Sequence, residues 1–197
     1  MEHALLTRHA ESEASVAGLT NGDPRREIGL TALGSEQARR LGEQLANAQI
    51  ELCAVSEFRR AQETADIALA GREVPRLVLP GLNDIRFGEF EGQPLSDYRR
   101  WARAHGPEDV VPGGDSRAAT VRRYAEAFRT LLARPDGTIL VVAHSLPIRY
   151  ALDAAAGTLP APAVEQVPYA EPFELDANQL SRAVDVLERW VSAPTWR

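Results

Sequence analysis

The chain has 197 residues and a mass of 21.5 kDa, a length typical of one folded domain with a substantial core. Hydrophobic residues make up 44% and charged residues 25% of the sequence, so a disordered or fibrous chain is excluded. The formal net charge of −6 disfavours nucleic acid or an anionic membrane as the main partner. All 22 basic residues are arginine, which excludes Schiff-base lysine chemistry and any phosphate loop built on lysine.

The cysteine and histidine content gives no sign of a disulfide or a metal site. The single Cys53 has no intramolecular partner, and the four scattered histidines lack the spacing of zinc ligands. The apolar run at residues 4–6 is too short for a signal peptide, and no segment approaches the ~20 apolar residues of a membrane span. We therefore expect a cytoplasmic protein that uses no metal and no other cofactor.

Short apolar runs that suit buried strands alternate along the chain with segments of helical period. This alternation is typical of α/β proteins with a mainly parallel sheet. We predict a three-layer sandwich with helices on both faces of the sheet, formed by one domain over residues 1–197 with a small cap region around 106–114. In chain order we expect a strand at 3–7, a loop at 9–29, a helix from about 31, a strand at 52–55 and a helix at 58–70. A strand at 76–79 and helices at 94–105 and 116–133 should follow. The last elements are a strand at 138–143, a helix opened by Pro147 that ends near 157, an edge strand at 172–175 and a helix at 178–191.

Polar side chains follow the predicted strands at their carboxyl ends, where open α/β sheets bind ligands. The first strand leads into Arg8 and His9, the second is followed by Arg60, the fourth by His144, and Asp84 comes shortly after the third. Each residue has a structural interpretation when taken alone, such as a solvated strand end or a helix cap. Arginine forks suit tetrahedral oxyanions, however, and an imidazole can serve as a nucleophile that becomes phosphorylated. Together the five residues predict a site for phosphate chemistry.

The same residues lie in motifs that resemble the histidine phosphatase superfamily, also called phosphoglycerate mutase-like. Residues 5–12 read LLTRHAES, similar to the Arg-His-Gly signature after the first strand of that family. Leu30, Thr31 and Gly34 resemble its Leu-Thr-x-x-Gly helix start. The other matches, in family order, are Ser56, Arg60, Ala61 and Thr64 of the second basic motif, the acid-bearing segment 82–92, and the segments 112–116 and 141–144.

The resemblance implies a role for each matched residue of the site. His9 would attack phosphorus and form a phosphohistidine, while Arg8, Arg60 and His144 would hold the phosphoryl oxygens. Asp84 would protonate the leaving oxygen and then take a proton from the water that cleaves the phosphoenzyme. The implied substrate is a small phosphorylated metabolite, and the implied fold is the α/β sandwich predicted above.

Four positions depart from the family pattern. Ala10 stands where glycine is usual, and Asp84 replaces the more common glutamate, which makes Glu89 the reserve candidate for the acid. Ser15 stands where many members place an asparagine toward the phosphate, and Ser145 replaces the glycine after the second histidine. We keep Ser15 and Ser145 as candidate substrate-binding residues.

Two alternative functions remain beside the phosphatase, and a third is excluded. Phosphoryl transfer of the phosphoglycerate mutase type uses the same family chemistry, and a non-catalytic phospholigand-binding module would keep the fold without turnover. A serine hydrolase would use Ser145 as nucleophile, but all four histidines, at 3, 9, 105 and 144, precede it, so the triad order of that fold cannot be completed.

The sequence leaves the oligomeric state open. Candidate pocket residues are Arg25, Arg26, Glu89, Phe90, Tyr98 and Trp101, of which the two arginines would bind a second anionic group.

Overall fold

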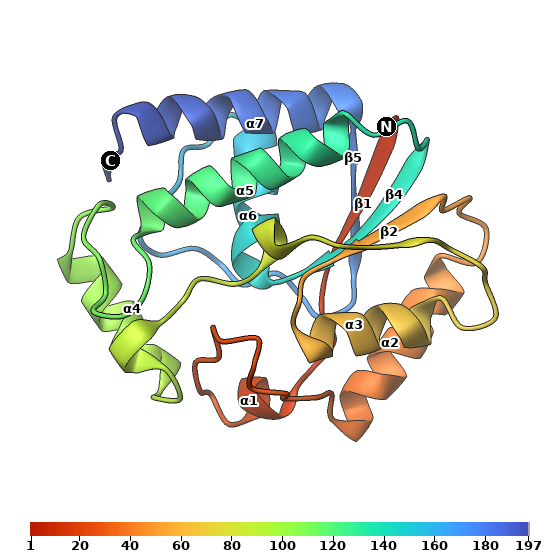
Figure 1. Cartoon of the computed structure of the whole chain (residues 1–197), viewed down its shortest axis with the longest axis horizontal. Coiled ribbons are helices and arrows are strands. Elements are labelled where there is room, and N and C mark those ends of the chain that lie inside the picture. Colours follow the sequence, from red (N-terminus) through yellow and green to blue (C-terminus); the bar gives the residue numbers. More distant parts are fainter. Residues whose placement is uncertain (197) are drawn as a thin grey trace.

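A five-stranded sheet runs through the computed structural model, which describes residues 1–196 (Figure 1). The strand order is β3-β2-β4-β1-β5. The first four strands are parallel, and β5 pairs antiparallel with β1 at one edge. The strands are β1 (His3–Arg8), β2 (Leu52–Val55), β3 (Arg76–Val78), β4 (Thr138–Ala143) and β5 (Pro172–Asp176).

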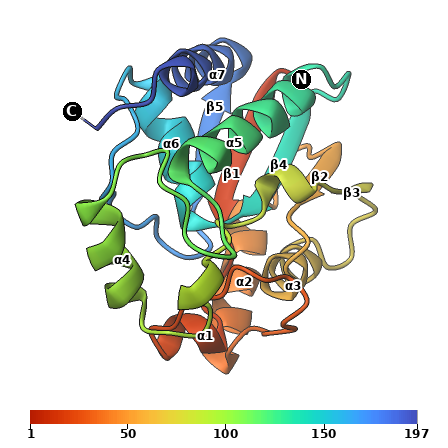
Figure 2. The ribbon, with the colours of Figure 1, turned by 60° about the vertical axis from the view of Figure 1, so that its left-hand side comes forward.

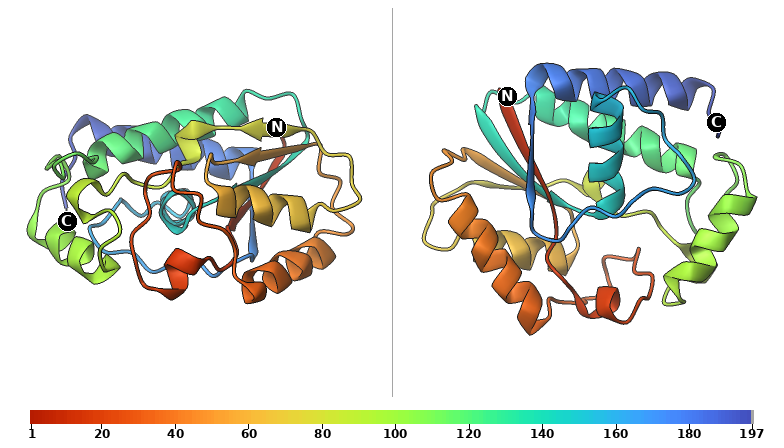
Figure 3. Two further views of the ribbon diagram at one scale, coloured as in Figure 1. Left: turned by 60° about the horizontal axis from the view of Figure 1, so that its bottom comes forward. Right: turned by 180° about the vertical axis from the view of Figure 1, so that it is seen from behind.

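Helices cover both faces of this sheet, which gives the three layers (Figure 3). Side chains that alternate along β4 explain the arrangement, because Ile139 and Val141 face one apolar cluster while Leu140 and Val142 face the other. One cluster is covered by α2 (Ala32–Gln44) and α3 (Arg59–Ala68), and the other by α5 (Arg117–Leu132), α6 (Ser145–Ala155) and α7 (Ala177–Ser192).

Helix α4 (Leu95–Ala104) lies outside the layers and forms the cap (Figure 2). Its Tyr98 packs edge-on against Phe87, with ring centroids 4.8 Å apart. The far end of α4 is held by Trp196, whose indole Nε1 donates to the His105 carbonyl at 2.9 Å. Short helical segments complete the cap side of the molecule: α1 (Glu13–Val16), η1 (Pro80–Leu82) and η2 (Gly88–Phe90).

The predicted α/β sandwich with a mainly parallel sheet is confirmed, and the elements differ from the prediction mostly by one or two residues at their ends. Helix α6 begins at Ser145, so Pro147 is its third residue rather than its first. Proline is tolerated there because the first turn of a helix has no internal acceptor for its N–H groups. Helix α1 was not predicted, since four residues inside a polar loop carry no periodic signal. Among residues 1–196, no helix combines the length and apolarity needed to cross a membrane.

Helix α2 packs directly against the backbone that follows His9. The Glu11 N–H donates to Gln37 Oε1 at 2.9 Å, and the Thr31 hydroxyl donates to Glu11 Oε1 at 2.8 Å. A Cβ on Gly34 would lie only 2.0 Å from the Glu11 carbonyl oxygen. Glycine is therefore required at this position by a close approach of two backbones, and the approach fixes the segment that carries His9.

Replacing Gly34 with alanine tests this contact. In an open helix the change would stabilise by about 1 kcal/mol, but here we expect it to lower the free energy of unfolding by about 1–3 kcal/mol through overpacking. Urea denaturation measures the change, with Glu36→Ala on the exposed face of α2 as the control. A more stable Gly34→Ala protein would contradict the packing described.

Candidate active site

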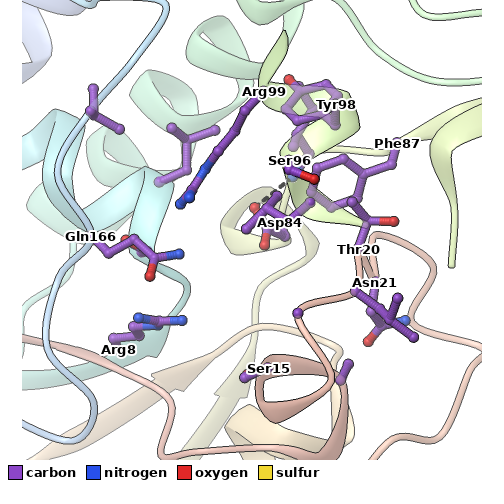
Figure 4. Close-up of a pocket in the computed structure, with 18 of the residues that line it drawn as sticks. Arg8, Ser15, Thr20, Asn21, Asp84, Phe87, Ser96, Tyr98, Arg99 and Gln166 are labelled. Atoms are coloured by element: carbon purple, nitrogen blue, oxygen red, sulfur yellow. Dashed lines mark hydrogen bonds between the residues drawn. The ribbon is translucent and has the colours of Figure 1, made fainter. Parts of the chain in front are cut away.

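A cavity of about 630 Å³ opens at the carboxyl end of the sheet, between the strand ends and the cap (Figure 4). Arg8, His9, Arg60 and Asp84 all line it, as do Ser15 and Ser145. The structure therefore brings most of the sequence-predicted site residues to one place. His144 is also close by. It is fully buried behind Arg60 and does not line the cavity.

His9 follows β1 and presents its unprotonated ring nitrogen to the site. Its Nδ1 lies 2.7 Å from the Ala10 carbonyl oxygen, which accepts a hydrogen bond and so places the ring proton on Nδ1. Arg60 Nε donates to Nε2 at 3.1 Å, which agrees with a lone pair there. Burial, followed by the charges of Arg60 and Arg8, lowers the pKa of His9 well below its usual value. The histidine is thus neutral, as a nucleophile must be.

Arg60, in the first turn of α3, contacts the other parts of the site through all its nitrogen atoms. Besides His9, it donates through Nη1 to Asn21 Oδ1 and through Nη2 to the Asn21 carbonyl and His144 Nδ1, both at 3.1 Å. Among residues 1–196, the carboxylate within 4.0 Å of its guanidinium is that of Asp84. Burial lowers the pKa of Arg60 to about 10, a shift that Asp84 opposes. A buried cation with mainly neutral acceptors favours a bound anion.

Arg8, the last residue of β1, is held by the segment before β5. Its Nη1 donates to the Val167 carbonyl at 2.9 Å, and its guanidinium carbon lies 3.8 Å from the centre of the Tyr169 ring. Within residues 1–196 its buried Nε has no hydrogen-bond partner. Burial lowers the pKa of Arg8, although the neighbouring Tyr169 and Asp84 raise it. Its cationic edge is therefore free to bind an anion in the cavity.

His144 is placed by β4 and by a hydroxyl from the neighbouring strand. Its Nε2 lies 2.9 Å from Ser56 Oγ, and its Nδ1 accepts from Arg60 Nη2 and lies 3.9 Å from Asp84 Oδ2. The ring packs edge-on against Phe58, with centroids 4.6 Å apart. Burial, followed by the charge of Arg60, lowers the pKa of His144 well below its usual value.

Asp84 faces the cavity, whereas Glu89 does not. Asp84 Oδ1 accepts from the Ile85 N–H at 2.9 Å, which leaves Oδ2 toward Arg60 and His144. Burial raises the pKa of Asp84, against the opposing charge of Arg60. Glu89 lies in the 3-10 turn η2 with an exposed side chain and is not part of the cavity wall. The geometry therefore favours Asp84 over Glu89 as the proton donor.

The two serines of the prediction have hydrogen bonds within the protein. Ser15 Oγ lies 2.7 Å from Ser12 Oγ, and Ser12 also lines the cavity. Ser145 Oγ accepts from the Val167 N–H at 2.9 Å and so fastens the segment that contacts Arg8. Both serines border the cavity, but neither hydroxyl is free of partners.

The sequence analysis missed Asn21. It considered Ser15 for the position next to the phosphate, but the structure places Asn21 beside Arg60. Its loop is fixed by Glu91, whose Oε2 accepts from the Gly22 N–H at 2.9 Å. Asn21 carries no local signal, because its position depends on a contact with a segment 70 residues away. An alignment of relatives could have identified it, as an asparagine that does not vary within a polar loop.

The prediction that Arg25 and Arg26 line the pocket is wrong. Arg25 pairs with Asp23 at 2.8 Å and Arg26 with Glu91 at 3.3 Å, and neither lines the cavity. Of the six pocket candidates, Tyr98 alone is part of its wall. The arginines that do reach the cavity from the cap are Arg99 and Arg103 of α4, which lie four residues apart on one helix face.

No three histidine, cysteine, aspartate or glutamate side chains are grouped so as to suit a metal ion in the part of the chain that is described. The positive charge at the site comes from Arg8 and Arg60. Two guanidiniums around a neutral imidazole, with a carboxyl group nearby, form an arrangement that can bind a phosphoryl group beside a nucleophile and a proton donor.

Comparison with known proteins agrees with this geometry. The sequence pattern of the histidine phosphatase superfamily (branch 1) matches residues 4–191. The chain belongs to this superfamily. Its sequence is 40% identical over 149 residues to the adenosylcobalamin/alpha-ribazole phosphatase of Escherichia coli K12, covering 71% of each chain. It is 34% identical over 169 residues to a 2,3-bisphosphoglycerate-dependent phosphoglycerate mutase of Methylorubrum extorquens, covering 76% of this chain and 77% of the mutase.

A solved histidine phosphatase structure has the same fold. The alpha-ribazole phosphatase of Shigella flexneri superposes with a TM-score of 0.76 at 28% identity, over 88% of this chain and 90% of that one. These matches confirm the predicted family, the fold class and the assignment to the phosphatases.

The buried histidines predict a pH dependence of stability. Their lowered pKa values mean that, below the usual value of 6.5, the unfolded chain binds protons that the folded protein does not. The free energy of unfolding therefore keeps its full value above pH 6.5. Below that pH it decreases by up to about 1.4 kcal/mol per pH unit for each histidine. Urea denaturation between pH 7.5 and 5 measures this slope, and His9→Gln should reduce it. An unchanged slope would contradict the neutral burial of His9.

Asp84 acts in the opposite direction. Because its pKa is raised from 3.8 in the folded protein, it contributes stability at low pH that is lost as the pH rises through the folded pKa. Asp84→Asn should therefore leave the stability at pH 7.5 unchanged or higher. A large loss of stability in this variant at neutral pH would contradict the raised pKa.

Proposed function

We propose that this histidine phosphatase hydrolyses phosphomonoesters through a phosphohistidine on His9. The single observation that carries the proposal is the neutral His9 ring at the cavity, whose unprotonated Nε2 accepts from Arg60 Nε. When a phosphoryl oxygen accepts that N–H instead, the Nε2 lone pair becomes available. Nε2 attacks phosphorus, and the bond from phosphorus to the ester oxygen breaks. Asp84 gives its proton to that oxygen, and an alcohol leaves.

The second step returns the enzyme to its starting state. Water attacks the phosphorus of the phosphohistidine, and Asp84, now a carboxylate, takes a proton from it. The bond between phosphorus and His9 Nε2 breaks, and inorganic phosphate is released. The raised pKa of Asp84 supports both roles, since a carboxyl group that holds its proton closer to neutral pH donates and accepts more readily there.

Arg8 and Arg60 stabilise the charge on the phosphoryl oxygens. Positioning and electrostatic stabilisation supply most of the catalysis in phosphoryl transfer, and both guanidiniums are buried where water screens them little. His144 joins them when a phosphoryl oxygen takes the place of Arg60 Nη2 as the partner of Nδ1. The ring then changes tautomer, so that its one proton is on Nδ1 and Nε2 accepts from the Ser56 hydroxyl. Until then it holds Arg60 in position.

Similarity to proteins of two activities leaves a second candidate, mutase-type transfer to another acceptor. The phosphoglycerate mutases among the relatives favour it. The alpha-ribazole phosphatases favour hydrolysis and make a ribazole phosphate the first natural substrate to test. Both candidates form the same phosphohistidine, and they differ in whether water or a second hydroxyl accepts the phosphoryl group.

Hydrolysis of 4-nitrophenyl phosphate in the presence of a chelator tests the proposal. We expect turnover by the wild type and a loss of at least about 10³-fold in kcat for His9→Ala, because the covalent step is removed. His105→Ala, which alters a histidine outside the cavity, is the matched control. Normal turnover by a folded His9→Ala protein would exclude the phosphohistidine, and a rate abolished by the chelator would show that a metal is needed.

Leaving groups of different basicity test the role of Asp84. Asp84→Asn should lower kcat about 10²-fold or more with glycerol 3-phosphate, but much less with 4-nitrophenyl phosphate, whose leaving group needs little protonation. Glu89→Gln is the control and should behave like the wild type with both substrates. The reverse pattern would make Glu89 the acid.

A further inference from the structure

The cavity carries far more positive charge than one phosphoryl group requires. Its lining includes one carboxylate, Asp84, and five guanidiniums, in a protein whose overall formal charge is −6. The five are Arg8, Arg60, Arg99, Arg103 and Arg117.

Three of these arginines already have a task. Arg8 and Arg60 lie beside His9, where the phosphoryl group is proposed to bind. Arg117 is buried and donates to the Tyr98 and Tyr150 hydroxyls at 2.8 Å and 2.7 Å, so it holds the base of the cap in place. Arg99 and Arg103 are left without a structural explanation.

Both remaining arginines project from the cap helix α4 at a spacing of four residues. Neither forms an ion pair within 4.0 Å in residues 1–196, whereas Arg100, between them on the same helix, pairs with Asp97. Figure 4 shows the Arg99 side chain extending into the cavity toward Gln166 and Arg8. Arg99 and Arg103 are exposed residues that also line the cavity, so their guanidiniums are accessible to a ligand that enters it.

The surroundings of Arg99 offer it no protein anion. Burial lowers the pKa of Arg8, and the charge of Arg99 lowers it further, so the two cations repel each other across the cavity. An anion between or beside them would attract both guanidiniums and so offset this repulsion. The lining also includes the apolar side chains of Leu19, Ile85, Phe87, Leu146 and Val164.

We propose that the leaving group of the substrate carries a second anionic group, a carboxylate or a phosphate, which binds to Arg99 and Arg103. The inference rests on the proposed function, because it takes the phosphoryl group to lie at His9. The substrate class is then a phosphomonoester whose leaving group ends in a second acidic group. Recognition at the second end is electrostatic, and Arg99 can form paired hydrogen bonds to either kind of anion.

Two matched pairs of compounds test the inference. Glycerol 3-phosphate and 3-phosphoglycerate differ by a carboxylate on a short chain, and phenyl phosphate and 4-carboxyphenyl phosphate differ by one on a ring. In at least one pair we expect the carboxylated member to have a KM about fivefold to twentyfold lower for the wild type. Arg99→Gln combined with Arg103→Gln should abolish the difference, while kcat for phenyl phosphate stays unchanged.

The control variants separate this site from general charge effects. Arg100→Gln removes one charge from the same helix outside the cavity and should keep the preference, and Arg99→Lys should keep part of it. The preference should also shrink as the salt concentration rises. Equal KM values within both pairs for the wild type, or a preference that survives the double variant, would overturn the inference.

Binding to the His9→Ala protein makes the test independent of turnover. Calorimetry with the same four compounds gives dissociation constants even if the wild type hydrolyses none of them. Absence of turnover by the wild type would count against the proposed function. Dissociation constants that do not depend on the carboxylate, or no binding of either carboxylated compound, would count against the second anionic subsite.

Discussion

The rest of the site depends on the hydrogen bonds that the buried guanidinium of Arg60 donates. Its donors reach His9 after β1, Asn21 in the following loop and His144 after β4. These partners come from separate parts of the chain, so Arg60 is satisfied only when β1, β4 and α3 are all in place. Since an unsatisfied buried cation is costly, the same network that prepares the site also ties folding to its assembly.

Several residues that characterise the superfamily act on the backbone of this site rather than on a substrate. Thr64 accepts from the Ala10 N–H at 2.9 Å and donates to the Arg60 carbonyl at 2.7 Å, which links the segment of His9 to α3. Glu11 holds the start of α2, and Gly34 allows the two backbones to meet. The motifs extend beyond the reacting groups because a nucleophile must be held to a fraction of an ångström.

The two ends of the cavity are built on different principles. The end at His9 is formed by strand ends and helix starts, which are rigid elements joined by the sheet. The other end is formed by α4 and by the connecting segment around Gln166, which lie outside the three layers. Chemistry placed on the sheet and recognition placed on the cap allow one reaction to be combined with many leaving groups.

The sequence by itself determined the fold class, the order of nearly all the elements and the residue types of the reacting centre. It could do so because apolar alternation and helical periodicity are local patterns, and because strands of a parallel sheet bring their carboxyl ends to one edge. Only the tertiary structure decided which of Asp84 and Glu89 faces the cavity, that Asn21 supports Arg60, and that the cap presents Arg99 rather than Arg25. Those outcomes depend on contacts between segments tens of residues apart, whose geometry no local pattern records.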